Sequence, residues 1–162
     1  MLQVGNVGLT ETESRSHFAL WCFMAAPLLI GTDLHTASNA TIAILGATEL
    51  IKLDQDPLGF QGRLVYDSAP DSEAGSAPPP SAARVQIYGK KSSDGSVGAL
   101  LLNRGETTAD ISLDFASVWA SGSLTVRDLW AEEDVGQFTG RYTAKAVPSH
   151  GNVALTLRKT EQ

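Results

Sequence analysis

The apolar pattern of this 162-residue chain changes its period once, near residues 59–62. Before this point, apolar residues at helical spacing alternate with short, continuously apolar runs. After it, apolar and polar residues alternate with a period of two, as in half-buried strands. One kind of element cannot follow both periods, because side chains share a face every 3.6 residues in a helix and every two in a strand. The pattern therefore predicts an α/β segment over residues 1–61 and an all-β domain over residues 62–162.

The front segment begins with an apolar run at residues 2–4 and then carries a capping box, in which Thr10 and Glu13 reciprocally cap the start of a helix. Pro27 ends that helix. Residues 28–30 form a continuously apolar run, typical of a strand buried on both faces of a parallel sheet. A second helix is predicted from an N-cap at Ser38 to Gly46, with one more turn over residues 49–53. Strand, helix, strand and helix in this order favour a parallel sheet or barrel.

The back segment contains seven or so short apolar runs separated by turn signals, which favours an antiparallel β-sandwich with Greek-key connections. The expected strands are residues 63–66, 84–88, 97–102, 111–115, 124–129, 138–142 and 153–157. Ser92, Ser93, Asp94 and Gly95 form a hairpin turn between the second and third of these. Residues 68–82 hold four prolines among many Ser and Ala residues, and are predicted to be a loop or flexible insertion.

The charge and composition exclude several classes of protein. A formal charge of −6 with mostly scattered basic residues, apart from adjacent ones such as Lys90 and Lys91, argues against partners such as nucleic acid or an anionic membrane surface. No apolar run reaches the roughly 18 residues that would span a bilayer. The single cysteine, Cys22, cannot form an internal disulfide and is predicted to be a small packed hydrophobe. No phosphate loop, dinucleotide fingerprint or zinc motif is present, so no cofactor and no metal are expected.

Candidate catalytic residues are few. Glycoside hydrolysis needs two carboxylates that face a sugar, and the front segment offers Asp33, Asp54 and Asp56. Asp33 follows the second predicted strand, where the active sites of barrels gather. A lone Asp in that position is more typical of a cap or turn, and Asp54 and Asp56 precede Pro57 in a structural turn. The three histidines, His17, His35 and His150, lack the spacing of a ligand set.

Two further features concern sugars. Trp21, Trp119 and Trp130 could form a platform on which a sugar stacks, although helical spacing favours a core position for Trp21, and a core position is also favoured for Trp130. Asn39, in the triplet Asn39-Ala40-Thr41, is a candidate glycosylation site if the protein is secreted.

Seven segments carry a resemblance to a known family, and they occur in that family's order. They are MLQVGN (1–6), RSHFALW (15–21), APLLIGTDL (26–34), DQDPLGFQG (54–62), VGALLLNRG (97–105), RDLW (127–130) and VPSHG (147–151). The first four resemble the end of the catalytic barrel of melibiase-type α-galactosidases, glycoside hydrolase family 27. The last three resemble the C-terminal β-sandwich of the same family.

The resemblance implies a fold and an activity. Residues 1–61 would be the last two βα units of a (β/α)8 TIM barrel, and residues 62–162 an antiparallel Greek-key β-sandwich. The parent would be a secreted (extracellular) retaining enzyme that removes terminal α-linked galactose from oligosaccharides and glycoconjugates, using two aspartates as nucleophile and acid/base. Both aspartates would lie upstream of Met1, so no catalytic residue is expected in this chain and the fragment alone is expected to be inactive. Met1 would lie at the mouth of the sugar pocket.

The chain departs from the family pattern at two residues, and two alternatives stay open. Val7 replaces a glycine, which would strain a turn that needs a positive φ, and Asp54 replaces an asparagine. The β-sandwich could instead be a non-catalytic carbohydrate-binding or barrel-buttressing module. The chain could also be a mis-started gene model, because Met1 corresponds to a methionine that in this family directly follows an aspartate of the pocket. No signal peptide is visible in the chain. Specificity for galactose against N-acetylgalactosamine or arabinopyranose, and the oligomeric state, are left open by the sequence.

Overall fold

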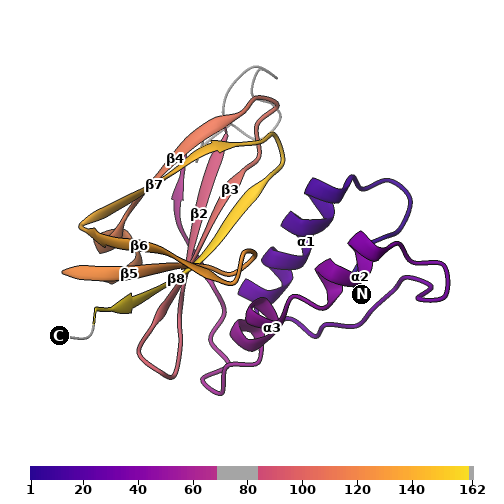
Figure 1. The fold of residues 1–162 in the computed structure, drawn as a ribbon, viewed down its shortest axis with the longest axis horizontal. Helices are drawn as coiled ribbons and strands as arrows, with labels where there is room; N and C mark the ends of the chain where they lie inside the picture. Colours follow the sequence, from indigo (N-terminus) through magenta and orange to yellow (C-terminus); the bar gives the residue numbers. More distant parts are fainter. Residues whose placement is uncertain (69–83, 161–162) are drawn as a thin grey trace, which may run out of the picture.

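The computed structural model describes residues 1–68 and 84–160 (Figure 1). From residue 69 onward, the loop predicted over residues 68–82 lies outside the described part. Figure 1 shows three helices gathered on one side of the molecule and the strands on the other. The change of period in the sequence therefore corresponds to a change from a helical layer to β-structure.

The helices begin where local sequence signals place them. They are α1 (Glu11–Phe23), α2 (Asn39–Leu45) and α3 (Thr48–Asp54). The capping box is confirmed, because the Glu13 N–H donates to the Thr10 hydroxyl at 3.2 Å and the Glu13 carboxylate accepts the Thr10 N–H at 2.8 Å. The Ser38 cap is confirmed too, since its hydroxyl accepts the Thr41 N–H at 3.1 Å. These contacts stabilise donors that a helix start leaves unpaired.

The β-structure forms two antiparallel sheets, which confirms the predicted β-sandwich. The strands are β1 (Arg63–Asp67), β2 (Val85–Lys91), β3 (Val97–Asn103), β4 (Ala109–Asp114), β5 (Ser123–Asp128), β6 (Glu133–Thr139), β7 (Arg141–Val147) and β8 (Asn152–Lys159), with a short 3₁₀ helix, η1 (Phe115–Val118), after β4. One sheet has the order β1-β2-β3-β8-β5-β6, and the other pairs β4 with β7. The last strand thus lies in the middle of the larger sheet, between β3 and β5.

One expected strand is wrong. Residues 138–142 were predicted as a single strand, but Gly140, with φ 75°, turns the chain between β6 and β7. These two strands belong to different sheets, so Phe138 and Tyr142 meet across the turn with ring centroids 5.1 Å apart. The apolar alternation continues through the turn because both rings pack against the same core. Hydrophobic periodicity alone therefore does not reveal the turn.

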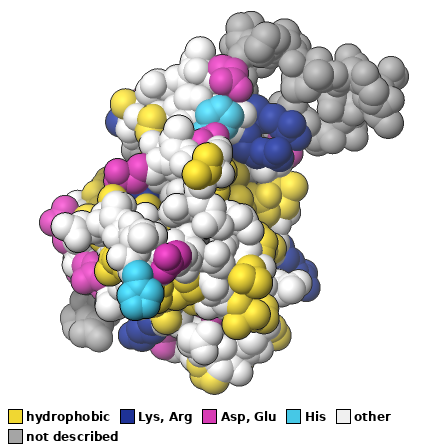
Figure 2. Space-filling model, turned by 90° about the vertical axis from the view of Figure 1, so that its right-hand side faces the viewer, with side chains coloured by type: hydrophobic (Ala, Val, Ile, Leu, Met, Phe, Trp, Pro, Cys, Tyr) yellow, Lys and Arg dark blue, Asp and Glu magenta, His cyan; other side chains and the backbone are white. Residues whose placement is uncertain are grey.

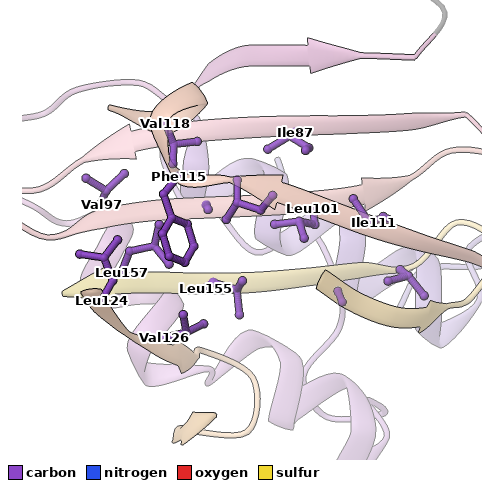
Figure 3. Close-up of a cluster of buried hydrophobic side chains, with 14 residues drawn as sticks. Ile87, Val97, Leu101, Ile111, Phe115, Val118, Leu124, Val126, Leu155 and Leu157 are labelled. Carbon is purple, nitrogen blue, oxygen red and sulfur yellow. The ribbon is translucent and has the colours of Figure 1, made fainter. Parts of the chain in front are cut away.

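The inner core lies between the two sheets (Figure 3). Alternate residues of β3 supply Val97, Ala99 and Leu101 to it, and Phe115 of η1 is fully buried within the cluster. The residues between them face the other way, so β3 is buried along its whole length. A strand that is buried on both faces must be covered by a second layer, which here is the helical one.

The second core lies between the larger sheet and the helices. Leu100 of β3 and Ala154 of β8 face it from the sheet, and Phe18, Phe23 and Leu53 face it from α1 and α3. Cys22 is fully buried in this cluster, which confirms its prediction as a packed hydrophobe. Burial raises the pKa of its thiol to about 12, so the thiolate that nucleophilic chemistry would need is suppressed at neutral pH.

The strand predicted at residues 28–30 is reduced to a single parallel bridge between Leu2 and Ile30. It was expected to be buried on both faces, and this is wrong: Leu29 is 61% and Ile30 is 43% exposed. Within residues 1–68 and 84–160, no strand pairs with the outer edges of the bridge. Figure 2 looks onto the helical side and shows hydrophobic side chains exposed there in several separate groups.

Candidate functional site

The bridge between Leu2 and Ile30 brings the two apolar runs of the front segment together. The Leu2 N–H donates to the Leu29 carbonyl oxygen at 2.8 Å. Gly31 makes this approach feasible, because a Cβ at that position would lie 2.7 Å from the Leu2 carbonyl oxygen. A residue with a side chain at position 31 would force the two segments apart.

A small polar cluster follows the bridged residues. The Thr32 hydroxyl lies 2.9 Å from the Asn6 side-chain oxygen and also contacts the Val4 carbonyl oxygen. The Asn6 amide in turn donates to the Gln3 side-chain oxygen at 2.9 Å. Ligand sites of α/β proteins lie beyond the carboxyl ends of parallel strands. The residues after the bridge are therefore the part of the chain best placed to border such a site.

Met1, the predicted substrate-binding residue, immediately precedes the bridged Leu2 and is 68% exposed. Its methyl group packs near Gly31, at 3.3 Å from where a Cβ on that glycine would lie. The strain expected at Val7 is absent, since the positive φ values in this turn belong to Gly5 and Gly8.

The three candidate carboxylates lie in two parts of the front segment: Asp33 follows the bridge, whereas Asp54 and Asp56 lie at the end of α3 and in the turn after it. Asp33 accepts the His35 N–H at 2.9 Å, and Asp56 accepts both the N–H of Ser93 at 2.9 Å and its hydroxyl at 2.7 Å. Asp54 ends α3 and is buried, with one oxygen bound to the Gln55 amide. Their interpretation as cap and turn residues is consistent with these contacts. Each carboxylate is engaged by hydrogen-bond donors close to it, which is more typical of cap and turn residues than of an acid and nucleophile pair.

Asp54 has an unusual environment for a carboxylate. Its second oxygen is buried and has no hydrogen-bond partner among the described residues. Burial raises the pKa of Asp54 and outweighs the opposing effects of the Gln55 amide and the Lys90 ammonium. Such a group stabilises the folded chain better as a neutral acid than as an anion.

The histidines are dispersed. His17 accepts the Gln3 N–H through Nε2 at 3.1 Å, and burial, helped by the Met1 ammonium, lowers its pKa, so it is neutral at pH 7. His150 lies in the predicted turn, with φ 57°, 3.3 Å from the Glu106 carboxylate. His35 is exposed after Asp33. In the described part of the chain, no group of three or more His, Cys, Asp or Glu residues could hold a metal ion.

The tryptophans do not form one platform. Trp21 and Trp130 both border the second core, where the Trp130 Nε1–H donates to Asn152 at 2.9 Å. Trp119 lies elsewhere, directly after η1, with 45% of its surface exposed and a left-handed backbone at φ 62°. Asn39, the candidate glycosylation residue, is exposed at the first position of α2.

Two other polar residues have structural roles that sequence reasoning missed. Lys90 is 1% exposed, and its ammonium donates to the Cys22 carbonyl oxygen at 3.1 Å. Arg127 of β5 binds Glu49 of α3. Strand alternation places Lys90 on the face of β2 that carries Tyr88, but only the docked helices make that face a buried one. Over the described residues, no helix is long and apolar enough to cross a membrane.

Comparison with known protein families explains this combination of elements. Residues 1–56 match the family model described as alpha galactosidase A, and residues 82–157 match the one described as the alpha galactosidase C-terminal beta sandwich domain. The chain belongs to the melibiase-type α-galactosidases. It matches their C-terminal part, and the family resemblance seen in the sequence is confirmed.

Individual relatives agree with the family assignment. A probable alpha-galactosidase from Dictyostelium discoideum is 37% identical over 99% of this chain and 39% of its own length. An alpha-N-acetylgalactosaminidase from Rattus norvegicus is 54% identical over 42% of the chain and 16% of its own length. The crystal structure of alpha-galactosidase I from Mortierella vinacea matches 99% of the chain with a TM-score of 0.84 and 26% identity, covering 38% of that protein. The chain thus spans about two fifths of the Dictyostelium and Mortierella proteins.

Proposed function

We propose that this chain is the C-terminal portion of a retaining α-galactosidase. In this proposal residues 1–61 supply the last two βα units of a (β/α)8 barrel, and residues 62–162 form the β-sandwich domain behind it. The observation that carries the proposal is the order of the two family matches, barrel part first and sandwich second. The parallel bridge between Leu2 and Ile30 supports it, because parallel pairing with an exposed edge is what two units taken from a barrel would retain.

The parent enzyme would be secreted and would hydrolyse terminal α-linked galactose in oligosaccharides and glycoconjugates. Retention requires one carboxyl group to protonate the leaving oxygen and a second, about 5 Å away, to capture the sugar. The carboxylates of Asp33, Asp54 and Asp56 are each engaged by hydrogen bonds from neighbouring residues, which supports their interpretation as structural groups. We therefore expect the 162-residue chain to be inactive alone, with Met1 at the pocket mouth only when the remaining barrel is present.

The test is a turnover assay of the purified chain on p-nitrophenyl α-galactoside. An α-galactosidase from Coffea arabica, a relative 38% identical over 93% of this chain, serves as the active control. No release of nitrophenol above buffer is expected. Turnover that follows the protein through successive purification steps, and that is lost in an Asp33→Asn variant, would overturn the expected inactivity.

The alternative role is that of a non-catalytic module, which either buttresses the barrel or binds carbohydrate. The contacts of the sandwich support the buttressing role. α1 and α3 pack on the outer face of the larger sheet through Leu100, and Arg127 binds Glu49 across the same boundary. A sandwich that holds the closing helices in this way would stiffen the end of a barrel. Melibiose titrated into the chain should then cause no change in tryptophan fluorescence, because buttressing needs no sugar contact.

A further inference from the structure

Trp119 borders a hollow of about 460 Å³ that the family assignment leaves without a role. The hollow lies where the 59–62 segment meets the β1–β2 edge, and Phe60, Gln61, Arg63 and Lys91 also line it. Its volume falls in the range of roughly 300–1,000 Å³ that is usual for small-molecule sites. Phe60 and Trp119 are both about half exposed, so two aromatic side chains are available to a ligand.

Strand register places the polar side chains on one face. Arg63 pairs with Gly89 across β1 and β2, and directly opposed residues point to the same side of a sheet. Lys91 is two residues from Gly89 and so shares that side. The indole of Trp119 also lies there, because a Cβ at Gly89 would come within 3.1 Å of its ring. Gly89 therefore leaves room for the indole on the face of the sheet that also carries Arg63 and Lys91.

The left-handed backbone of Trp119 holds the indole in this position. The backbone N–H of Trp119 donates to the Ala116 carbonyl oxygen at 3.1 Å, and this hydrogen bond ends η1. Bulky residues rarely adopt a positive φ, and strained residues of this kind concentrate at binding sites. The indole nitrogen has no hydrogen-bond partner among the described residues, in contrast to that of Trp130. Trp119 thus presents both an open ring and an unused donor.

The charge of the hollow is opposite to that of the chain. Arg63 and Lys91 line it, and within residues 1–68 and 84–160 no carboxylate does so, although the net charge is −6. Neither cation forms an ion pair with a described residue; the Lys91 ammonium lies instead 5.3 Å from the Trp119 ring centroid. An exposed cation–π contact is weaker than a charge-assisted hydrogen bond to an anion. An anionic group entering the hollow would therefore draw Lys91 off the ring.

We propose that this hollow is a binding site for an acidic saccharide, in which a sugar ring stacks on Trp119 and its carboxylate or sulfate is held by Arg63 and Lys91. The aromatic face suits the apolar C–H side of a pyranose, and the Gln61 amide can serve its hydroxyl groups. The site involves neither Met1 nor the polar cluster beyond the Leu2–Ile30 bridge. Its test needs no turnover, so its failure would leave the α-galactosidase assignment untouched.

The test titrates trigalacturonate into the full 162-residue chain while tryptophan fluorescence is recorded, with neutral galactotriose and AMP as comparison ligands. We expect saturable quenching by trigalacturonate that weakens with added salt. Arg63→Gln and Lys91→Gln should each weaken binding roughly tenfold or more, because each removes a charge-assisted hydrogen bond. Lys145→Gln is the matched control, since Lys145 is an exposed lysine on β7 paired with Asp110, and it should bind as the parent chain does.

Trp119→Ala should abolish the quenching, with far-UV circular dichroism used to show that the chain remains folded. Because Arg63 and Lys91 are exposed, their variants keep the test decisive even if Trp119→Ala unfolds. Absence of saturable quenching by trigalacturonate would overturn the proposal, and so would equal binding by the Arg63 and Lys91 variants. Equal affinity for galactotriose would refute the anionic ligand, and equal affinity for AMP would refute the saccharide.

Discussion

The Arg127 guanidinium on β5 donates hydrogen bonds to the Glu49 carboxylate on α3, with Nη2 2.6 Å from Oε1 and Nε 2.9 Å from both carboxylate oxygens. Arg127 also lies 3.3 Å from Asp134 on β6. The Glu49 carboxylate, foremost among these contacts, raises the pKa of Arg127 above its usual value. A bidentate contact of this kind fixes the orientation of the two side chains as well as their distance. It therefore ties the helical layer to the larger sheet in one docking geometry.

Glu49→Gln is expected to lower the thermal midpoint of the chain by several degrees. The amide keeps the shape of the side chain but cannot offer two charged acceptors to Arg127. The loss should shrink in 1 M NaCl, where the Debye length falls to about 3 Å. Differential scanning calorimetry at low and high salt measures both effects. Glu106→Gln, which removes an exposed partner of His150, is the control and should change the midpoint little; equal midpoints for the two variants would contradict the prediction.

Gly98→Val is expected to destabilise the chain by about 1–3 kcal/mol through overpacking. A Cβ at Gly98 would lie 3.1 Å from Leu53 Cδ1 on α3 and 3.4 Å from Phe23 Cε1 on α1. Valine has the higher strand propensity, so a loss of stability here would point to crowding against the side chains of Leu53 and Phe23. Urea unfolding measures the effect. Ser123→Val, at an exposed position of β5, should be close to neutral, and a stabilised Gly98→Val chain would show that the helices do not pack this closely.

Local signals in this sequence predict structure well because their partners are close in the chain. Thr10 and Glu13 are three residues apart, and so are Ser38 and Thr41, so each pair completes its hydrogen bonds within the first turn of its helix. The Asp56-Pro57 turn is likewise visible in the sequence. The family motifs add the order of the elements, which no single motif supplies.

The failures concern residues whose surroundings are set by distant segments. Gly140 hides a turn between two sheets because Phe138 and Tyr142 share one core. Ile30 reads as buried on both faces, yet only Leu2 pairs with it in the described chain. Lysine is usually a surface residue, but Lys90 is buried by α1, whose Cys22 lies 68 residues earlier in the chain. Periodicity predicts which face of an element a residue occupies, but whether another layer covers that face depends on tertiary packing.

Asp54→Asn is expected to stabilise the chain at pH 7 by on the order of 1 kcal/mol, since it removes a buried and partly unpaired charge. Burial raises the pKa of Asp54 in the folded chain, whereas the unfolded carboxyl titrates near 3.9. The neutral acid therefore contributes its full stability below that unfolded value, and the contribution is lost as the pH rises through the raised folded pKa. The advantage of asparagine should accordingly grow as the pH increases from about 4 toward 7.

Chemical denaturation of both proteins at several pH values measures this dependence on pH. Lys90 retains its hydrogen bond to the Cys22 carbonyl oxygen in the variant, so the neighbouring buried donor stays paired. Asp56→Asn provides a control of opposite sign, because the Asp56 carboxylate accepts hydrogen bonds from Ser93 and Leu58 that an amide cannot fully replace. A stability difference that is constant across this range of pH would mean that Asp54 titrates alike in the folded and unfolded chains.

Asn39 is expected to carry one N-linked glycan when the chain is expressed with a secretory leader in eukaryotic cells. It heads the only Asn-X-Ser/Thr triplet in the sequence and is exposed at the start of α2, where a glycan would project into solvent. Mass spectrometry before and after deglycosylation measures it. Asn39→Gln and Thr41→Ala should abolish the mass difference, whereas Thr41→Ser should keep it because serine preserves the triplet and a hydroxyl that can bond to Ser38, which the Thr41 hydroxyl contacts at 3.0 Å. A secreted chain of unmodified mass would contradict the assignment of Asn39.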